Sequence, residues 1–258
     1  MTLRCCCLPL EFMEEFKMDK KEAVRIITSC AKMYHQELEN KNLLFLFGHQ
    51  DHVESFEAAF LPKNFLHLTG IRPNSADFVN SSDFYEKCLK GQLSPKEFNF
   101  ASNGTTALKL RILPELMKIH KTAKMVGEYN FSKSLLITEK LAGNITACEG
   151  FVRDDKYYIP NTALKEDIRK LIRQPYKRML AICRKENDKP LYSELCYTAK
   201  GVELHSLNLP DGIWQKISPA LLLAEPEKTP FNNLLVQLTH NKAKETTKNQ
   251  ERNNDPER

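Results

Sequence analysis

The spacing of apolar residues changes near residue 123, and this change constrains the fold more than any other feature of the chain. From 105 to 121, apolar side chains recur at steps of three and four residues, which indicates an amphipathic helix that Pro114 can kink. Beyond 123 the apolar runs are short and bounded by turn residues, as in strands, and they lie at 125–129, 134–138, 147–152, 157–159, 178–184 and 191–197. This order predicts an α+β fold, with N-terminal helices followed by a mainly antiparallel β-sheet.

Other elements are predicted from the same patterns. Residues 11–38 have helical spacing, 43–47 are typical of a buried strand, and 54–61 fit a strand or a short helix. Residues 75–89 predict a helix that is capped by Ser75, or that begins later at Ser81 or Ser82. A second helix start is predicted at 93–97. Pro160 is expected to end its strand, before a basic amphipathic helix at 164–172.

The ends of the chain differ in composition from its middle. Residues 1–10 carry no interpretable pattern and are predicted to be unstructured, although the Cys5–Cys7 run is also a candidate for palmitoylation. We expect one α+β domain at 11–205 and a C-terminal extension at 206–240 with a short helix near 231–238. The stretch 241–258 has almost no apolar residues and is expected to be a disordered tail.

Composition excludes several classes of protein. The formal net charge of +5 is mild, and it permits a polyanionic partner without requiring one. No segment approaches the roughly 20 apolar residues that cross a membrane, and the N-terminus lacks the pattern of a secretory signal, so no membrane association is expected. The eight cysteines include no C-x-x-C pair, which is typical of a reduced cytosolic protein with cysteines in its core. The motifs of serine hydrolases, kinases and zincins are absent from the sequence.

One apolar run, residues 65–71, contains the polar pair His67 and Thr69. A buried polar group without a partner costs on the order of 1–3 kcal/mol, so this pair must be hydrogen-bonded in the core or belong to a site. A core histidine paired with a backbone carbonyl is one interpretation, and a catalytic acid or base is the other. If the run is a strand, Thr69 shares a face with His67 and binds a phosphate, or it is an ordinary strand threonine.

Five stretches of the chain occur in a characteristic order. They are Phe65–Ile71, Asp83-Phe84-Tyr85, Leu108-Lys109-Leu110 with Leu113-Pro114, Gly150-Phe151, and Tyr157–Thr162 with Leu164 and Asp167. Together they resemble the phage branch of the Barnase–EndoU–colicin–RelE-like fold, in its fourth subgroup, over roughly residues 40–200. The resemblance implies a central antiparallel sheet, a metal-independent ribonuclease activity without a cofactor, a phage or prophage origin, and a location in the cytoplasm of the host cell.

Metal-free RNA cleavage needs a base for the 2′-hydroxyl, an acid for the 5′-oxygen and cations for the charge on the phosphate. His67 is the candidate base or acid, Lys109 is the candidate phosphate clamp, and Thr162 is the third candidate catalytic residue. The alternative interpretations are a core histidine, a solvated helix lysine and a threonine that caps a helix. If the catalytic interpretation holds, these side chains and the cluster at 157–162 converge in one cleft.

The candidate substrate-binding residues are Thr69, Tyr157, Tyr158, Asn161, Arg178 and Lys185. A tyrosine can stack on a base and donate to a phosphate, and an arginine can bind a phosphate through two hydrogen bonds. The alternative for the cluster at 157–162 is sheet core. A further basic group is either a solvated face or a track for an RNA backbone, and it consists of Lys165, Arg169, Lys170, Arg173 and Lys177.

The stretch His49-Gln50-Asp51-His52 has two histidines that could bind zinc, but a structural zinc site needs four ligands and no partner cluster is suitably spaced. We therefore predict an exposed turn and no metal site. The predicted function is a metal-independent endoribonuclease, with RNA or another nucleic acid, and a host protein or an inhibitor, as partners. The alternatives are a phage-derived binding module that has lost the chemistry and recognises nucleic acid or a host protein, and a structural protein of the virion.

Overall fold

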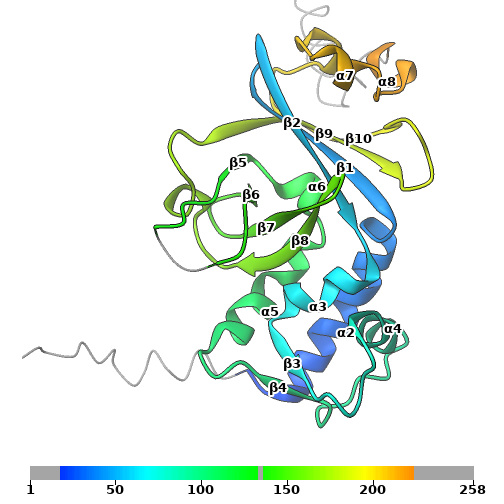
Figure 1. The fold of residues 1–258 in the computed structure, drawn as a ribbon, viewed down its shortest axis with the longest axis vertical. Coiled ribbons are helices and arrows are strands. Elements are labelled where there is room, and N and C mark those ends of the chain that lie inside the picture. Colours follow the sequence, from blue (N-terminus) through cyan, green and yellow to red (C-terminus); the bar gives the residue numbers. More distant parts are fainter. Residues whose placement is uncertain (1–17, 133–135, 224–258) are drawn as a thin grey trace, which may run out of the picture. The chain divides into compact units, whose positions relative to one another are not determined.

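The structure is a computed structural model that describes residues 18–132 and 136–223 (Figure 1). Contacts divide the chain into two compact units, 1–222 and 223–258, and the fold given below is that of the first. The predicted domain boundaries at 10, 205 and 240 stay predictions. The Cys5–Cys7 run, the helix expected near 231–238 and the tail at 241–258 lie outside the described residues.

The described residues form an α+β fold, as the change in apolar spacing predicted. The helices are α2 (Lys20–Glu37), α3 (Phe65–Thr69), α4 (Ser81–Leu89), α5 (Thr105–Leu116), α6 (Ile119–Thr122), α7 (Asp211–Trp214) and α8 (Pro219–Leu223). The strands are β1 (Lys41–His49), β2 (His52–Phe60), β3 (Ile71–Pro73), β4 (Phe98–Phe100), β5 (Met125–Glu128), β6 (Lys140–Gly143), β7 (Cys148–Asp154), β8 (Tyr157–Leu164), β9 (Lys177–Glu186) and β10 (Glu194–Thr198). Short 3-10 turns are η1 (Pro62–Asn64), η2 (Ile168–Lys170) and η3 (Leu204–Ser206).

The main sheet is built from two antiparallel groups of strands, β2-β1-β9-β10 and β8-β7-β6-β5 (Figure 1). The groups meet at two places. β2 and β8 share a single parallel bridge pair, Ala58 with Tyr158, and β5 and β9 share two antiparallel pairs. Because β1 also pairs with β9, the pairings close a ring of β1, β2, β8, β7, β6, β5 and β9, with β10 beside β9. Strands β3 and β4 form a separate two-stranded ribbon.

One face of the main sheet, here called the inner face, carries the main hydrophobic core. The rings of Phe45 and Phe56 stack with their centroids 4.6 Å apart, and Phe151 meets Phe56 edge to face at 5.5 Å. Helices α2 and α5 pack on the same core through Ile27 and Leu113. Full burial of each such side chain contributes about 1.5–3 kcal/mol to folding, so this core fixes the helices against the sheet.

Two helix predictions need correction, and one open alternative is settled. The helix expected at 75–89 has the later of its two predicted starts, at Ser81. Its cap is Asn80 and not a serine, because the Asn80 side chain accepts hydrogen bonds from the N–H groups of Ser82 and Asp83, at 2.8 and 3.1 Å. No helix begins at 93–97; Glu97 accepts from the Ser94 N–H at 2.7 Å within a turn that leads into β4. Residues 164–172 contain only the short turn η2. The helix at 105–121 is confirmed as α5 and α6, with Pro114 inside α5.

The strand predictions hold except at two places. Of the strand expected at 134–138, residues 136–138 are not in a strand, residues 134 and 135 lie outside the described part, and β6 begins at Lys140. Pro160 does not end its strand, because β8 continues to Leu164. The register between β7 and β8 shifts beside Pro160, and a bulge is one of the few positions in a sheet that tolerates proline. Residues 54–61, which fitted two interpretations, lie mostly in β2.

Cysteines are part of the core, as expected. Cys30, Cys88, Cys148 and Cys183 are buried free thiols, whereas Cys196 is half-buried. Burial raises the pKa of the Cys30 thiol to about 12, which makes it unreactive as a nucleophile at neutral pH. Within the described ranges, no helix combines the length and the apolar character needed to span a membrane.

Candidate functional site

His67 lies on a short helix and not on a strand. Phe65 and Leu68 bury one side of α3, and the helix ends at Gly70, whose φ of +68° is the left-handed conformation that glycine adopts without strain. Residues two apart on a helix point in directions about 160° apart, on nearly opposite sides. His67 is therefore exposed while Thr69 is fully buried, and the two side chains do not share a face.

The Thr69 hydroxyl is occupied inside the fold. It donates to the Leu66 carbonyl at 2.7 Å and accepts from the Ile71 N–H at 3.3 Å. A buried hydroxyl with both roles filled is not available to a phosphate. The substrate-binding role predicted for Thr69 is therefore corrected to a structural one, in which it holds the end of α3.

Lys109 joins α3 to β8. Its aliphatic stem crosses Gly70 so closely that a Cβ on this glycine would lie 2.6 Å from the Lys109 Cδ. The amine then donates to the His67 carbonyl at 3.2 Å and to the Thr162 Oγ1 at 3.0 Å. The structure thus brings together the three residues that sequence reasoning proposed as catalytic.

The start of α5, the helix that carries Lys109, is also tied to the end of α3. The buried Thr106 hydroxyl donates to the Gly70 carbonyl at 2.7 Å and accepts from the Ala101 N–H at 2.8 Å. Each such hydrogen bond contributes roughly 0.5–1.5 kcal/mol. The two helices are therefore held in register at the point where Lys109 crosses.

The charges at this site are unusual. Lys109 has no carboxylate partner among the described residues, and burial lowers its pKa from the ordinary value. The pKa of His67 is also lowered, first because part of its otherwise exposed ring is shielded from water and then by the positive charge of Lys109. A histidine with a lowered pKa is mostly neutral at pH 7, so its imidazole can accept a proton. This imidazole makes no hydrogen bond with the part of the chain that the structure describes.

Thr162 and Asn161 lie at the bulge of β8. Thr162 pairs with Gly150 of β7, and a Cβ on Gly150 would lie 2.6 Å from atoms of both Thr162 and Thr138. The Asn161 amide nitrogen donates to the Ile137 carbonyl, and its buried Oδ1 has no hydrogen-bond partner among the described residues. Thr162 is in the middle of a strand, so it does not cap a helix, and its neighbour Asn161 holds an unused acceptor.

Tyr158 lies four residues before Thr162 on the same strand. Its ring meets Phe56 edge to face at 5.4 Å, and two cations approach it, Lys140 at 5.6 Å and Arg153 at 5.5 Å from the ring centroid. Tyr157 is half-buried, with the Lys156 amine 5.3 Å from its ring. Sequence reasoning missed Lys140 and Arg153, because only the register of three strands brings them to Tyr158, and no local pattern shows it.

Arg178 and Lys185 are not part of this constellation. Both side chains lie on the outer face of the sheet, which is opposite the inner face and buries Leu180 and Cys183 of β9. The Arg178 guanidinium donates to the Lys200 carbonyl at 2.9 Å, and the buried Lys185 amine donates to the Lys189 carbonyl at 2.8 Å. The structure places them away from Lys109 and gives them backbone partners, which corrects their predicted role in the substrate site.

Two other predicted groups are resolved. The stretch from His49 to His52 is the tight turn between β1 and β2, with both histidines exposed, so the prediction of an exposed turn is confirmed. The basic group at 165–177 is not one helix face, because 164–172 is not a helix. Arg169 pairs with Asp167 at 2.6 Å, and Lys177 pairs with Glu54 at 2.6 Å.

Comparison with known proteins gives one match. The model of a family described as phage-Barnase-EndoU-ColicinE5/D-RelE like nuclease4 matches residues 26–201, which is more than half of the 258 residues. No curated protein and no solved structure gives a significant match. The matched range contains His67, Lys109 and Thr162, and it confirms the resemblance that five short stretches indicated.

Proposed function

Because the chain belongs to the phage-Barnase-EndoU-ColicinE5/D-RelE like nuclease4 family, we propose that it is an endoribonuclease that cleaves RNA by acid–base transesterification without a metal ion. A nuclease family has a nucleic acid as its substrate. The finer statements, that the substrate is RNA and that side chains alone provide the catalysis, rest on the constellation of His67, Lys109 and Thr162.

The observation that carries the proposal is the position of the Lys109 amine. It is held between the His67 carbonyl and the Thr162 hydroxyl, and no carboxylate among the described residues neutralises it. A partly buried cation without a counter-charge is costly unless a ligand supplies the negative charge. A phosphate at this point would do so, and the same cation would stabilise the charge that develops on the phosphate during cleavage.

In the proposed reaction, the 2′-oxygen attacks phosphorus while the 2′-hydroxyl proton passes to the His67 imidazole. The bond between phosphorus and the 5′-oxygen breaks, and the leaving oxygen takes a proton from the Lys109 ammonium. The products are a 2′,3′-cyclic phosphate and a 5′-hydroxyl, and solvent returns the proton from the imidazolium to Lys109. The lowered pKa values of the two groups suit these roles, since His67 is a free base at neutral pH and Lys109 is a stronger acid than an ordinary lysine.

A second candidate function is binding of nucleic acid without cleavage. One observation favours it: the His67 imidazole has no hydrogen bond, within the described ranges, that would fix its tautomer. In most nucleophile–base pairs the base is oriented by a third group. Both candidate functions use the same phosphate contact at Lys109. They differ only in whether the bond between phosphorus and the 5′-oxygen is broken.

The decisive experiment is cleavage of a fluorescent RNA oligonucleotide in EDTA. Wild type is expected to cut it and to leave a cyclic phosphate, and an oligonucleotide with only 2′-deoxy sugars is expected to remain intact. His67→Ala and Lys109→Ala are each expected to lower the rate about 10²–10⁴-fold, the range for loss of an acid–base group. Thr162→Val is expected to lose about tenfold, because it removes one hydrogen bond to Lys109.

The matched control is His52→Ala, which removes an exposed histidine from the β1–β2 turn. It is expected to cut like wild type. If wild type cuts no RNA but binds it, the second candidate replaces the first. If His67→Ala cuts as fast as His52→Ala, the site assignment is wrong.

A further inference from the structure

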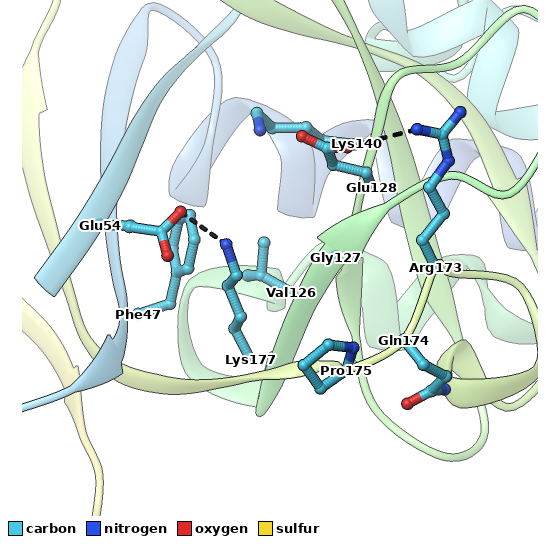
Figure 2. Close-up of a pocket in the computed structure, with 10 residues that line it drawn as sticks. All are labelled: Phe47, Glu54, Val126, Gly127, Glu128, Lys140, Arg173, Gln174, Pro175 and Lys177. Carbon is cyan, nitrogen blue, oxygen red and sulfur yellow. Dashed lines mark hydrogen bonds and ion pairs between the residues drawn. The ribbon is translucent and has the colours of Figure 1, made fainter. Parts of the chain in front are cut away.

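A shallow cavity of about 220 Å³ opens on the inner face of the sheet, beside Tyr158. Side chains of β5, β6 and β8 line it, together with Phe131 and Arg173 from the segments that follow β5 and η2. A neighbouring cavity of about 310 Å³, drawn in Figure 2, shares Glu128, Lys140 and Arg173 with it. The ion pair of Lys177 and Glu54 also lines this neighbouring cavity. The two cavities therefore adjoin, and Lys140 and Arg173 lie where they meet.

Aromatic rings and cations alternate along these two cavities, and Arg153 lies beside them at the Tyr158 ring without lining either one. Lys140 and Arg153 approach the ring of Tyr158 at 5.6 and 5.5 Å, and Arg173 approaches the ring of Phe131 at 5.8 Å. Phe131 is 53% exposed, and only the edge-to-face contact with the Tyr129 ring, at 5.5 Å between centroids, is recorded for it among the aromatic side chains of the described residues. We name Phe131, Lys140, Arg153, Tyr158 and Arg173 the aromatic–cation groove.

The cations of the groove are only weakly neutralised. Lys140 has no ion pair among the described residues, and the Arg153 guanidinium donates to the Asp155 carbonyl. Two carboxylates line the same cavity: Glu128 lies 3.9 Å from Arg173, with both side chains well exposed, and Glu139 accepts from the Arg153 N–H. An exposed pair at this distance contributes at most about 1 kcal/mol, so Arg173 can exchange it for another anion.

Strand register gathers three side chains of the groove on the inner face, at the stretch of β8 that precedes the bulge beside Thr162. Lys140 pairs with Phe151, and Arg153 pairs with Tyr158, so these side chains share the inner face. Tyr158 and Thr162 are four residues apart on β8, so at most roughly 13 Å of strand separates them, with the bulge at Asn161 in between. A nucleic acid bound at Lys109 by one phosphate would therefore reach the groove with its flanking nucleotides.

We propose that the aromatic–cation groove binds the nucleotides next to the scissile phosphate in single-stranded RNA, a proposal that rests on the proposed function. Bases stack on Tyr158 and Phe131, and phosphates contact Lys140, Arg153 and Arg173. Every base has a face that can stack, so the groove accepts many sequences. Bases inside a duplex are already stacked on each other, so the groove selects single strands over duplexes.

The test measures binding apart from cleavage. Full-length chain with His67→Ala is titrated into a labelled single-stranded RNA of 12 nucleotides, and into the same RNA as a duplex, at several salt concentrations with anisotropy as the readout. Single-stranded RNA is expected to bind more tightly than the duplex. Lys140→Gln with Arg153→Gln is expected to lower the slope of log K against log salt by about 1.4, the value for two phosphates on a single strand.

Phe131→Ser removes the exposed ring and is expected to weaken single-strand binding by roughly fivefold to 100-fold with no change in the salt slope. The matched control for charge is Lys32→Gln with Lys90→Gln, which removes one exposed lysine from α2 and another from the C-cap that follows α4. This control is expected to bind like the parent. Thermal unfolding of each variant verifies that it is folded before its affinity is compared.

Equal affinities of the groove variants and the control would overturn the proposal, and so would equal binding of single strand and duplex. Wild-type cleavage of the same RNA is measured in parallel. Groove variants that lose binding while wild type does not cleave would support the groove and reject the ribonuclease. If the wild type cleaves the RNA while the groove variants bind it normally, the ribonuclease proposal is supported and the groove proposal is rejected.

Discussion

The contact between Gly70 and Lys109 makes a sharp prediction about activity. A Cβ at Gly70 would lie 2.6 Å from the Lys109 Cδ, which is 0.8 Å closer than the 3.4 Å at which ordinary contact begins. The stem of Lys109 must therefore move by nearly 1 Å. Its hydrogen bonds to Thr162 and to the His67 carbonyl, at 3.0 and 3.2 Å, cannot both survive such a shift.

Gly70→Ala is expected to have two effects. The positive φ costs roughly 1–2 kcal/mol of stability once a Cβ is present. The displaced ammonium is expected to lower RNA cleavage about 10²-fold, since misplacement of a catalytic group by about 1 Å can cost that much. Urea unfolding measures the first effect, and cleavage of the fluorescent oligonucleotide in EDTA measures the second.

Gly104→Ala is the matched control. Gly104 also has a positive φ, of +75°, but a Cβ there would meet no atom within 4 Å. It is expected to lose a similar stability and to keep its cleavage rate. The reasoning is refuted if both variants lose cleavage equally, or if Gly70→Ala cuts at the wild-type rate.

Three further predictions concern stability and titration. Thr106→Val is expected to lose about 1–3 kcal/mol in urea unfolding, because it leaves the Gly70 carbonyl and the Ala101 N–H without their partner; no loss would contradict this. Burial raises the pKa of Glu149, so the folded state keeps its proton when the unfolded state has lost it. The protonated Glu149 contributes its full stability below the pKa that Glu149 has in the unfolded chain. As the pH rises from there toward the higher pKa that it has in the folded protein, the free energy of unfolding declines by up to about 1.4 kcal/mol per pH unit. Glu149→Gln is expected to remove that decline, and parallel pH profiles for the variant and wild type would contradict it. Lys109→Gln is expected to raise the pKa of His67 in an NMR titration, since it removes a nearby positive charge; an unchanged pKa would show that the charge is too distant to matter.

Local pattern was sufficient for the fold class and for the order of most strands. The period of apolar residues is a local property, and it changes where α6 ends and β5 begins. Residues 65–71 show where local pattern fails. Phe65 and Leu68 suit a helix turn, but Phe65-Leu66 and Leu68 also suit a buried strand, and the left-handed Gly70 decides between them. The prediction that Thr69 shares a face with His67 depended on the wrong alternative.

The candidate site was predictable as a set of residues but not as a geometry. His67, Lys109 and Thr162 belong to the stretches that carry the family resemblance, whereas their meeting depends on how α3, α5 and β8 pack. Arg178 and Lys185 show the opposite case. Arginine and lysine on a late strand are reasonable phosphate ligands, yet a register shift within β9 decides which face they occupy, and sequence spacing alone does not reveal the shift.

The single bridge pair between β2 and β8 has a consequence for how the molecule opens. The sheet consists of two halves, and long ladders hold each half together, while the halves share three pairs at their two junctions. Amide protons of β5 to β8 are therefore expected to exchange with solvent as one cooperative unit, at a lower free energy than those of β1 and β9. Lys109 contacts both α3, which follows β2, and β8, so it bridges the junction between β2 and β8. A ligand that holds the Lys109 ammonium in place would therefore also slow amide exchange throughout strands β5 to β8.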